Sequence, residues 1–294
     1  MGLKPYLQLV RLPNVFTAAA DSLAGWLLVR GTLDEPGRWL PLVLASACTY
    51  AGGIVLNDVF DIEVDRVERP DRPLPSGRVG LRFARIFGFG LMAAGVALAA
   101  VSGVTHAFPV ECALVACVML YDLGLKRSAL GPELMGACRG LNLLLGLCGG
   151  ARLGGSVYWI AAMAYGLFVT GITWISRSEV DGGSRKNLGL GIVLQNLAIA
   201  TLIVVSLLIS TADVRLGFGA VLLLAIAVFV GRKTIEAYRN IDPKLIQGSI
   251  KAAILSLVWI HVALVLAARG PIPAVAVGIL WFPAAFAGRW IYST

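Results

Sequence analysis

Residues 39–65 read WLPLVLASACTYAGGIVLNDVFDIEVD, an apolar run that ends in a group of acidic residues. The apolar part, residues 39–56, has the length of ~17 to 25 residues that a helix needs to cross a bilayer. The run is too long and too uniform for a strand, and only helices or closed barrels satisfy the backbone in lipid. This stretch therefore predicts a membrane-spanning helix with a polar end.

Similar apolar runs recur along the whole chain. The 294 residues are 58% hydrophobic and only 14% charged, whereas a soluble domain carries about 25% charged residues. No linker or low-complexity tract divides the chain, so we expect a single domain, residues 1–294, with an all-α, polytopic membrane fold. The predicted membrane segments are 14–30, 39–56, 83–104, 107–123, 134–150, 157–176, 188–210, 216–231, 249–268 and 272–290.

The basic residues are distributed unevenly between the two sides of this predicted bundle. The net charge is +8, and with the N-terminus in the cytoplasm most Lys and Arg residues fall on cytoplasmic helix ends and loops. This distribution is the positive-inside pattern. We therefore expect a multi-pass integral membrane protein with its N-terminus and its polar loops in the cytoplasm. The excess charge indicates anionic membrane lipid as a partner, and no nucleic acid.

Thiol and imidazole groups offer little for a metal site. The five Cys residues all lie in the apolar segments, and the chain has only two His residues, His106 and His261. A zinc site needs Cys or His ligands at characteristic spacings, and no such spacing occurs. We expect the Cys residues to be small core residues, and we exclude a His-rich metal site.

The polar end of the second segment carries the first candidate site. Asn57, Asp61 and Asp65 are four residues apart, so they share one face of a helix, and Asp58 adds another carboxylate. Like charges gathered at a membrane boundary repel one another. Mg²⁺ relieves such repulsion, and it typically combines a few carboxylates with substrate phosphates. The alternative is a solvated helix end balanced by nearby arginines.

Basic and amide residues near the same membrane face form a candidate anion site. The guanidinium fork suits phosphate oxygens, and a Lys at a helix end acts as a point charge on a diphosphate. An Arg inside an apolar helix usually faces a polar cavity. Anchoring by the positive-inside rule, or a simple helix start, remains the alternative for several of them. The candidates are Arg11, Asn14, Arg66, Arg72, Lys126, Arg139 and Asn142.

With these residues assembled, the chain resembles the UbiA superfamily of intramembrane prenyltransferases. The family pattern Asn-Asp-x-x-Asp-x-x-x-Asp, at the end of the second helix, matches residues 57–65. The layout covers nearly the whole chain. Supporting matches are Arg72–Gly77 after that motif, Tyr121 with Lys126 after the fourth segment, and Arg11 with Asn14 at the first.

The resemblance implies nine or ten helices around a central cavity and an Mg²⁺-dependent reaction. An isoprenyl group would pass from its diphosphate to a lipophilic acceptor, aromatic or other, within the membrane. Asn57, Asp61, Asp65 and Lys126 would be the catalytic residues. The metal ligands would be Asn57, Asp58, Asp61 and Asp65, and the diphosphate would bind Arg11, Asn14, Arg66, Arg72, Lys126, Arg139 and Asn142.

The chain departs from the family in its second acidic motif, which usually holds several Asp residues. At the end of the sixth segment only Glu179 and Asp181 are acidic, while Ser176 and Gly183 occupy positions where Asp is expected. A second metal site would have only Glu179 and Asp181 as ligands. This departure and the tenth apolar segment fit a divergent branch such as the EboC-like proteins.

Other functions remain in competition with prenyl transfer. A lipid-phosphate phosphatase needs catalytic His residues, and neither His106 nor His261 lies near the Arg72–Gly77 motif, so we reject it. A non-catalytic, UbiA-like lipid-binding or transport-associated protein is the alternative that we keep, because of the eroded second motif. No residue stands out as an acid or base for the acceptor.

Overall fold

The computed structural model describes residues 2–151, 155–180, 183–210 and 217–291, apart from the side chains at 179, 180 and 288–291. Within these ranges all regular structure is helical, which confirms the all-α prediction. The elements are α1 (Lys4–Leu9), α2 (Leu12–Arg30), α3 (Pro36–Phe60), α4 (Ile62–Glu68), α5 (Leu81–Val101), α6 (Ala107–Asp122), the 3₁₀ turn η1 (Leu125–Arg127), α7 (Gly131–Leu147), α8 (Ser156–Val180), α9 (Arg185–Ile209), α10 (Phe218–Asn240), α11 (Pro243–Arg269), α12 (Pro271–Gly278) and α13 (Trp281–Ile291).

Nine of the predicted segments each correspond to one helix, namely α2, α3 and α5 to α11. Seven of the described helices are long and apolar enough to cross a membrane, and α6 and α7, with 16 and 17 residues, are slightly shorter. The tenth segment, 272–290, forms two short helices instead of one span. Pro283 lies in the first turn of α13, where its missing N–H does no harm, but it would interrupt one continuous helix.

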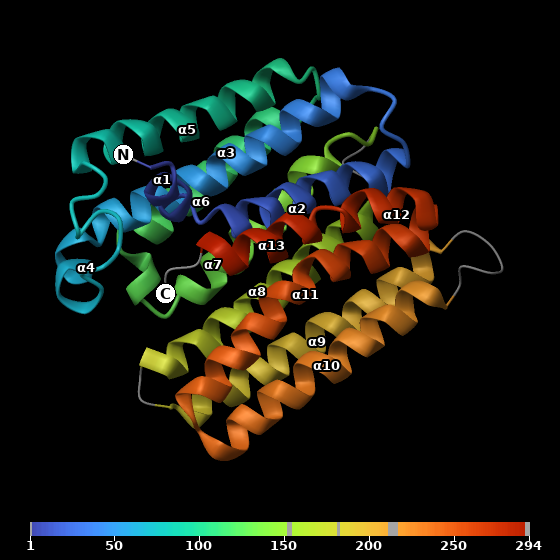
Figure 1. The fold of residues 1–294 in the computed structure, drawn as a ribbon. Coiled ribbons are helices and arrows are strands. Elements are labelled where there is room, and N and C mark those ends of the chain that lie inside the picture. The colour runs from blue at the N-terminus through green and yellow to red at the C-terminus, as the bar shows by residue number, and fades with distance from the viewer. Residues whose placement is uncertain (1, 152–154, 181–182, 211–216, 292–294) are drawn as a thin grey trace.

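The helix α2 occupies the middle of the bundle (Figure 1). It packs against α3, α7, α11 and α13. Its apolar side chains are almost completely buried, as in Trp26, Leu27 and Leu28. Figure 1 shows α3, α5 and α6 above α2, and α8, α9 and α10 below it. The polar residues that α2 carries are therefore inside the protein, and not at its surface.

A close crossing holds α2 against α7. A Cβ atom on Gly146 would overlap the carbonyl oxygen of Ser22, and one on Gly25 would overlap that of Leu143. Only glycine permits such an approach of two backbones, as in many membrane helix pairs. The crossing fixes the position of α7, which carries Arg139 and Asn142.

We expect Gly146→Ala to lower the free energy of unfolding by about 1–3 kcal/mol, the usual cost of overpacking. Chemical denaturation in detergent micelles measures it. Gly90→Ala is the matched control, because a Cβ atom at Gly90 would meet nothing within 4 Å. Equal effects of the two substitutions would show that the α2–α7 crossing has no special role.

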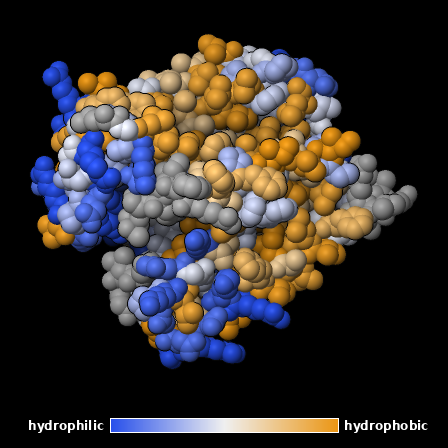
Figure 2. Space-filling view, in the orientation of Figure 1, coloured by the Kyte–Doolittle hydropathy of each residue, from blue (hydrophilic) through white to orange (hydrophobic). Residues whose placement is uncertain are grey.

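The outer surface matches a protein surrounded by lipid. Large apolar side chains are exposed along the long helices, among them Phe89 on α5 and Leu224 on α10. Figure 2 shows apolar residues over the middle of the molecule and hydrophilic residues gathered at the left and lower edges, where Figure 1 places α4 and the loop between α10 and α11. The chain is therefore an integral, multi-pass membrane protein, as predicted.

Candidate active site at the end of α3

The acidic cluster, Asn57, Asp58, Asp61 and Asp65, lies where α3 passes into α4. The helix α3 ends at Phe60, yet the backbone N–H of Asp61 still donates to Asn57 O (3.0 Å) and that of Asp65 to Asp61 O (2.8 Å). The chain thus continues to wind across the break. Asn57, Asp61 and Asp65 stay on successive turns, as their spacing predicts.

Two carboxylates of the cluster share a pair of arginines. Asp58 and Asp65 are only 4% and 3% exposed. The Arg11 guanidinium donates to Asp58 at 3.0 Å, and Arg72 donates to Asp65 at 2.7 Å while also lying 3.4 Å from Asp58. Because buried carboxylates need charged partners, these arginines belong to the cluster. The structure thus brings together Arg11 and Arg72 as the sequence predicts.

Local backbone structure holds both arginines in place. Arg11 lies between α1 and α2 with a φ of 45°, a left-handed conformation that is strained for a residue other than glycine. Arg72 belongs to a tight loop, in which the backbone N–H and the hydroxyl of Ser76 both donate to Arg72 O (3.1 and 2.6 Å). Such strain is common at functional sites, where surrounding contacts maintain it.

Asp61 faces a different basic group, on the turn η1. Lys126 donates to Asp61 at 2.6 Å, and Arg127 lies 3.3 Å from the same carboxylate. Gly124, with a φ of 140°, makes the turn that follows α6. Arg177 of α8 donates to the carbonyl oxygens of Lys126 and Ser128, which anchors the turn. Lys126, predicted as a diphosphate contact, thus lies beside the acidic cluster.

A further residue, Asp122, contacts the cluster, although the sequence did not single it out. The amide of Asn57 donates to Asp122 Oδ1 at 2.7 Å. Asp122 ends α6, is 4% exposed, and its Oδ2 has no hydrogen-bond partner among the described residues. Its place at a helix end, four residues before Lys126, is the only signal in the sequence that marks it.

Two predicted residues, Arg66 and Asn14, form no hydrogen bond or ion pair with the cluster in the described part of the chain. Arg66 forms an exposed pair with Glu63 at 2.8 Å, one turn along α4. Asn14 lies near the start of α2, where its backbone N–H donates to Arg11 O (2.8 Å). The side chain of Glu179 and all of Asp181 fall outside the described residues. A second metal site at the end of α8 therefore stays a prediction.

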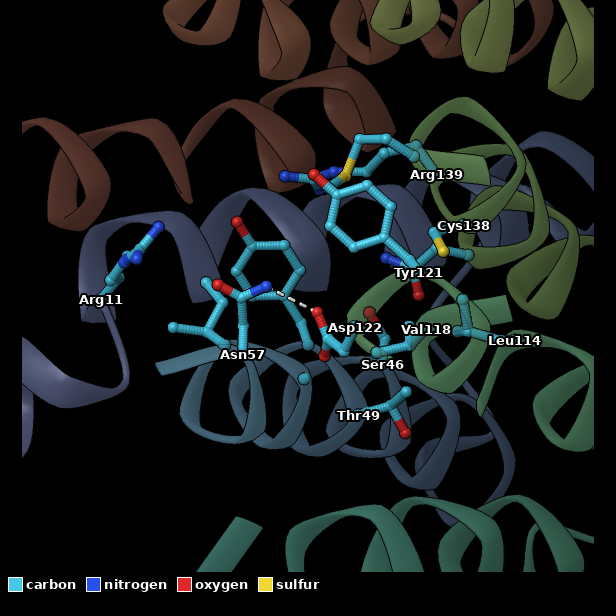
Figure 3. Close-up of a pocket in the computed structure, with 15 residues that line it drawn as sticks. Arg11, Ser46, Thr49, Asn57, Leu114, Val118, Tyr121, Asp122, Cys138 and Arg139 are labelled. Carbon is cyan, nitrogen blue, oxygen red and sulfur yellow. Dashed lines mark hydrogen bonds between the residues drawn. The ribbon is translucent and has the colours of Figure 1, made fainter. Parts of the chain in front are cut away.

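A cavity of about 180 Å³ opens beside the cluster, between α3, α6 and α7. Figure 3 shows Arg11 and Asn57 on one side of it and Leu114 and Thr49 on the far side. Its middle is mainly apolar. We call the wall formed by Arg11, Asn57, Tyr121 and Asp122 the outer end of the cavity, and the wall formed by Ser46, Thr49, Arg139 and Asn142 the deep end.

The deep end is supported by a buried carboxylate on α2. Asp21 is 0% exposed and accepts hydrogen bonds from Arg139 (2.7 Å), Asn142 (3.0 Å) and Tyr165 (2.6 Å). His261 Nε2 lies 2.8 Å from its Oδ1. Four helices, α2, α7, α8 and α11, thus meet at one ion pair. Arg139 and Asn142 lie on the wall of the cavity, at its polar deep end, but their partner is Asp21 and not the acidic cluster.

The oxygen donors of the cluster fit Mg²⁺ only together with further ligands. Among the residues that the structure describes, no three Asp, Glu, His or Cys side chains form a ready metal site. Each carboxylate of the cluster instead has a basic partner. Mg²⁺ prefers oxygen ligands and completes its octahedron with water or substrate phosphates. The cluster therefore suits a metal ion that arrives with a diphosphate.

Comparison with known proteins shows the family to which the chain is similar. A model described as the UbiA prenyltransferase family matches residues 18–247. The digeranylgeranylglyceryl phosphate synthase of Sulfolobus acidocaldarius is 33% identical over 236 residues, which cover 77% of this chain and 84% of that protein. The enzyme of the same name from Saccharolobus solfataricus is 30% identical and covers 86% of this chain and 91% of its own length.

Solved structures share the fold. A structure described as giving insight into digeranylgeranylglyceryl phosphate synthase in membranes superposes with a TM-score of 0.71, at 22% identity, over 92% of this chain and 99% of that chain. A UbiA homologue from Archaeoglobus fulgidus, bound to GPP and Mg²⁺, has a TM-score of 0.66 at 15% identity, over 89% of this chain and 99% of its own. These likenesses confirm the helical membrane fold.

Proposed function

Since the chain belongs to the UbiA prenyltransferase family, we propose that it transfers an isoprenyl group from an isoprenyl diphosphate to a lipophilic hydroxyl acceptor, with Mg²⁺ at the acidic cluster. The observation that carries the proposal is the pairing of Asp58, Asp61 and Asp65 with Arg11, Arg72 and Lys126 next to an apolar cavity. Prenyl transfer needs charge for the diphosphate beside an apolar space for the acceptor and the reacting carbon.

The basic residues of the cluster bind and stabilise the leaving group. In the structure, carboxylates pair with the basic side chains of Arg11, Arg72 and Lys126. If Asn57, Asp61 and Asp65 held Mg²⁺ instead, these basic side chains would be available to the diphosphate oxygens. Bound Mg²⁺ would share the negative charge that develops on the diphosphate as the allylic C–O bond breaks. The apolar cavity wall keeps water from the carbocation, so the acceptor hydroxyl captures it and passes its proton to the released diphosphate.

Two aromatic side chains near the cavity, Tyr50 and Tyr165, contribute little to stabilising the carbocation. Tyr50 lines the cavity, but the Arg139 guanidinium lies 4.8 Å from its ring centre. Tyr165 is fully buried and donates to Asp21. Because a cation already occupies the Tyr50 face, the diphosphate itself is the main counter-charge for the carbocation.

The names of the relatives bear on the acceptor. Proteins named digeranylgeranylglyceryl phosphate synthase support a hydroxyl of a phosphorylated glycerol lipid as the acceptor group. A phosphate on that lipid would find a basic partner in Arg11 at the outer end of the cavity, whereas the charge of Arg139 at the deep end is balanced by Asp21. An aromatic acceptor is the alternative, and we keep it for the test below.

The purified protein with a radiolabelled isoprenyl diphosphate, Mg²⁺ and each acceptor class tests the proposal. We expect labelled product that disappears when EDTA removes the metal and returns with added Mg²⁺. Mass spectrometry of lipids that copurify with the protein would identify the natural acceptor. Lack of transfer to every acceptor, together with binding of intact lipid, would instead favour the non-catalytic lipid-binding function.

We expect Lys126→Ala to raise the KM for the isoprenyl diphosphate at least about tenfold, because a charge-assisted hydrogen bond contributes roughly 1.5–3 kcal/mol. Steady-state kinetics with varied donor measures this. Arg66→Ala is the matched control, since Arg66 is exposed and pairs with Glu63. A larger effect of Arg66→Ala would place the diphosphate on the other face of α4.

A further inference from the structure

The deep end of the cavity is polar, although its surroundings lie far inside the membrane protein. We propose that it binds an uncharged, hydrogen-bond-donating group of the acceptor, such as a hydroxyl, through the side-chain oxygen of Asn142. The inference rests on the proposed function, because it takes the cavity to be the place where the acceptor meets the isoprenyl diphosphate. It assigns a binding subsite separate from the acidic cluster.

The orientation of the Asn142 side chain is fully determined. Its Nδ2 donates to Asp21 Oδ2 and to the carbonyl oxygen of Ala18, both at 3.0 Å. These two bonds use both hydrogens of the amide group. The remaining Oδ1 is buried and has no partner among the described residues, and Asn142 is 3% exposed on the cavity wall. A buried acceptor atom of this kind lacks its hydrogen-bond donor, which a ligand in the cavity would supply.

The other polar groups of the deep end already have protein partners. Ser46 donates to the carbonyl oxygen of Ala18 at 2.7 Å, and Thr49 donates to Glu111. Arg139 donates to Asp21 at 2.7 Å and to Thr17 at 3.0 Å. The open hydrogen-bonding position is therefore a carbonyl oxygen, so the ligand group must be a donor.

An anionic group does not fit the deep end. The charge of Arg139 is balanced by Asp21, which is completely buried with it. A carboxylate or phosphate placed here would face the unpaired oxygen of Asn142. It would find no cation free to pair with it, and burying an unpaired charge costs much free energy. A phosphorylated acceptor would therefore keep its phosphate near Arg11 and Arg72 and turn an uncharged group inward.

An isoprenyl tail fits the deep end no better. Ser46 and Asn142 both donate to the carbonyl oxygen of Ala18, so they lie at the same depth. At 1.5 Å per residue, Ser46 is about 16 Å along α3 from Asn57. A hydrocarbon tail over this depth would leave Asn142 Oδ1 unpaired. An acceptor with a hydroxyl at its far end would donate a hydrogen bond to Oδ1, and its other end would reach the reacting carbon of the isoprenyl diphosphate.

Three probes with the same biphenyl core test the subsite. They are 4,4′-dihydroxybiphenyl, 4,4′-dimethoxybiphenyl and biphenyl-4,4′-dicarboxylate, titrated into the full-length protein in detergent micelles, with empty micelles as the blank. Each probe is symmetric, so the same group reaches the deep end in either orientation. We expect the dihydroxy compound to bind at least about tenfold more tightly than the dimethoxy compound, as for the loss of one buried hydrogen bond. The dicarboxylate should bind most weakly.

The substitution Asn142→Leu should reduce the difference between the first two probes to about twofold or less. Gln195→Leu is the matched control, because Gln195 is a buried amide on α9 outside the cavity, and it should keep the wild-type order. Equal binding of the three probes to the wild type, tightest binding of the dicarboxylate, or no binding at millimolar concentration overturns the inference, even if Asn142→Leu does not fold.

The two proposals fail separately. Probe binding needs neither Mg²⁺ nor turnover of the donor, so an inactive protein that still prefers the dihydroxy probe would retain the subsite and lose the proposed function. An active prenyltransferase without that preference would retain the function and lose the subsite.

Discussion

Replacing Asp61 by Ala is expected to lower kcat/KM for isoprenyl transfer by a factor of about 10² to 10³ or more. That range is typical when one electrostatic contributor to a transition state is removed. Asp61 is the proposed metal ligand that also holds Lys126 at 2.6 Å, so its loss affects both the metal and a diphosphate contact. Transfer of a radiolabelled isoprenyl group by the purified variant measures the effect.

The matched control for this experiment is Glu63→Ala, two residues further along. Glu63 is exposed and, among the described residues, its ion pair is with Arg66. We expect its removal to change kcat/KM by less than about threefold, as for surface ion pairs in general. Comparable losses in the two variants, or full activity of Asp61→Ala, would contradict the assignment of the metal site to the acidic cluster.

The second large effect is expected on stability, from Asp21→Ala. The substitution leaves Arg139 charged and buried without its carboxylate, and breaking a buried pair in this way costs about 3–5 kcal/mol. It also removes the shared partner of Asn142, Tyr165 and His261. Denaturation of the purified variant, followed by the loss of helical circular dichroism, measures the change in unfolding free energy.

The double variant Asp21→Leu with Arg139→Leu separates the unpaired charge from the loss of packing. Replacing both members of a buried pair by apolar residues is often nearly neutral, so most of the stability should return. Asp34→Ala, on an exposed loop, should have little effect. A double variant as unstable as Asp21→Ala alone would mean that the ion pair is not the source of the loss.

The membrane fold and the acidic cluster could be predicted from the sequence because both depend on local pattern. Apolar runs long enough to span a bilayer identify nine of the helices. The spacing of Asn57, Asp61 and Asp65 is preserved because the hydrogen bonds of α3 continue past its end. The break in the last segment, between Gly278 and Trp281, shows the limit of hydropathy alone, because hydropathy does not detect the missing N–H of the nearby Pro283.

The partners of these residues could not be predicted in the same way. Asp21 is one polar residue within an apolar segment, and Asp122 is one acid at a helix end. Each becomes significant only through residues far away in the chain, Arg139 and His261 for Asp21 and Asn57 for Asp122. A single sequence holds no signal for such pairs, since no period or spacing relates them.

By itself, the sequence determined that this protein is a helical membrane protein with an acidic cluster at the end of its second long helix. Hydrophobic run length and helical period are local properties, so they can be read from neighbouring residues without knowing the rest of the fold. Only the tertiary structure decided that Arg139 and Asn142 belong to Asp21 and not to that cluster. The reason is physical: a buried charge takes the nearest partner that packing supplies, and packing joins α2, α7, α8 and α11 across the whole chain.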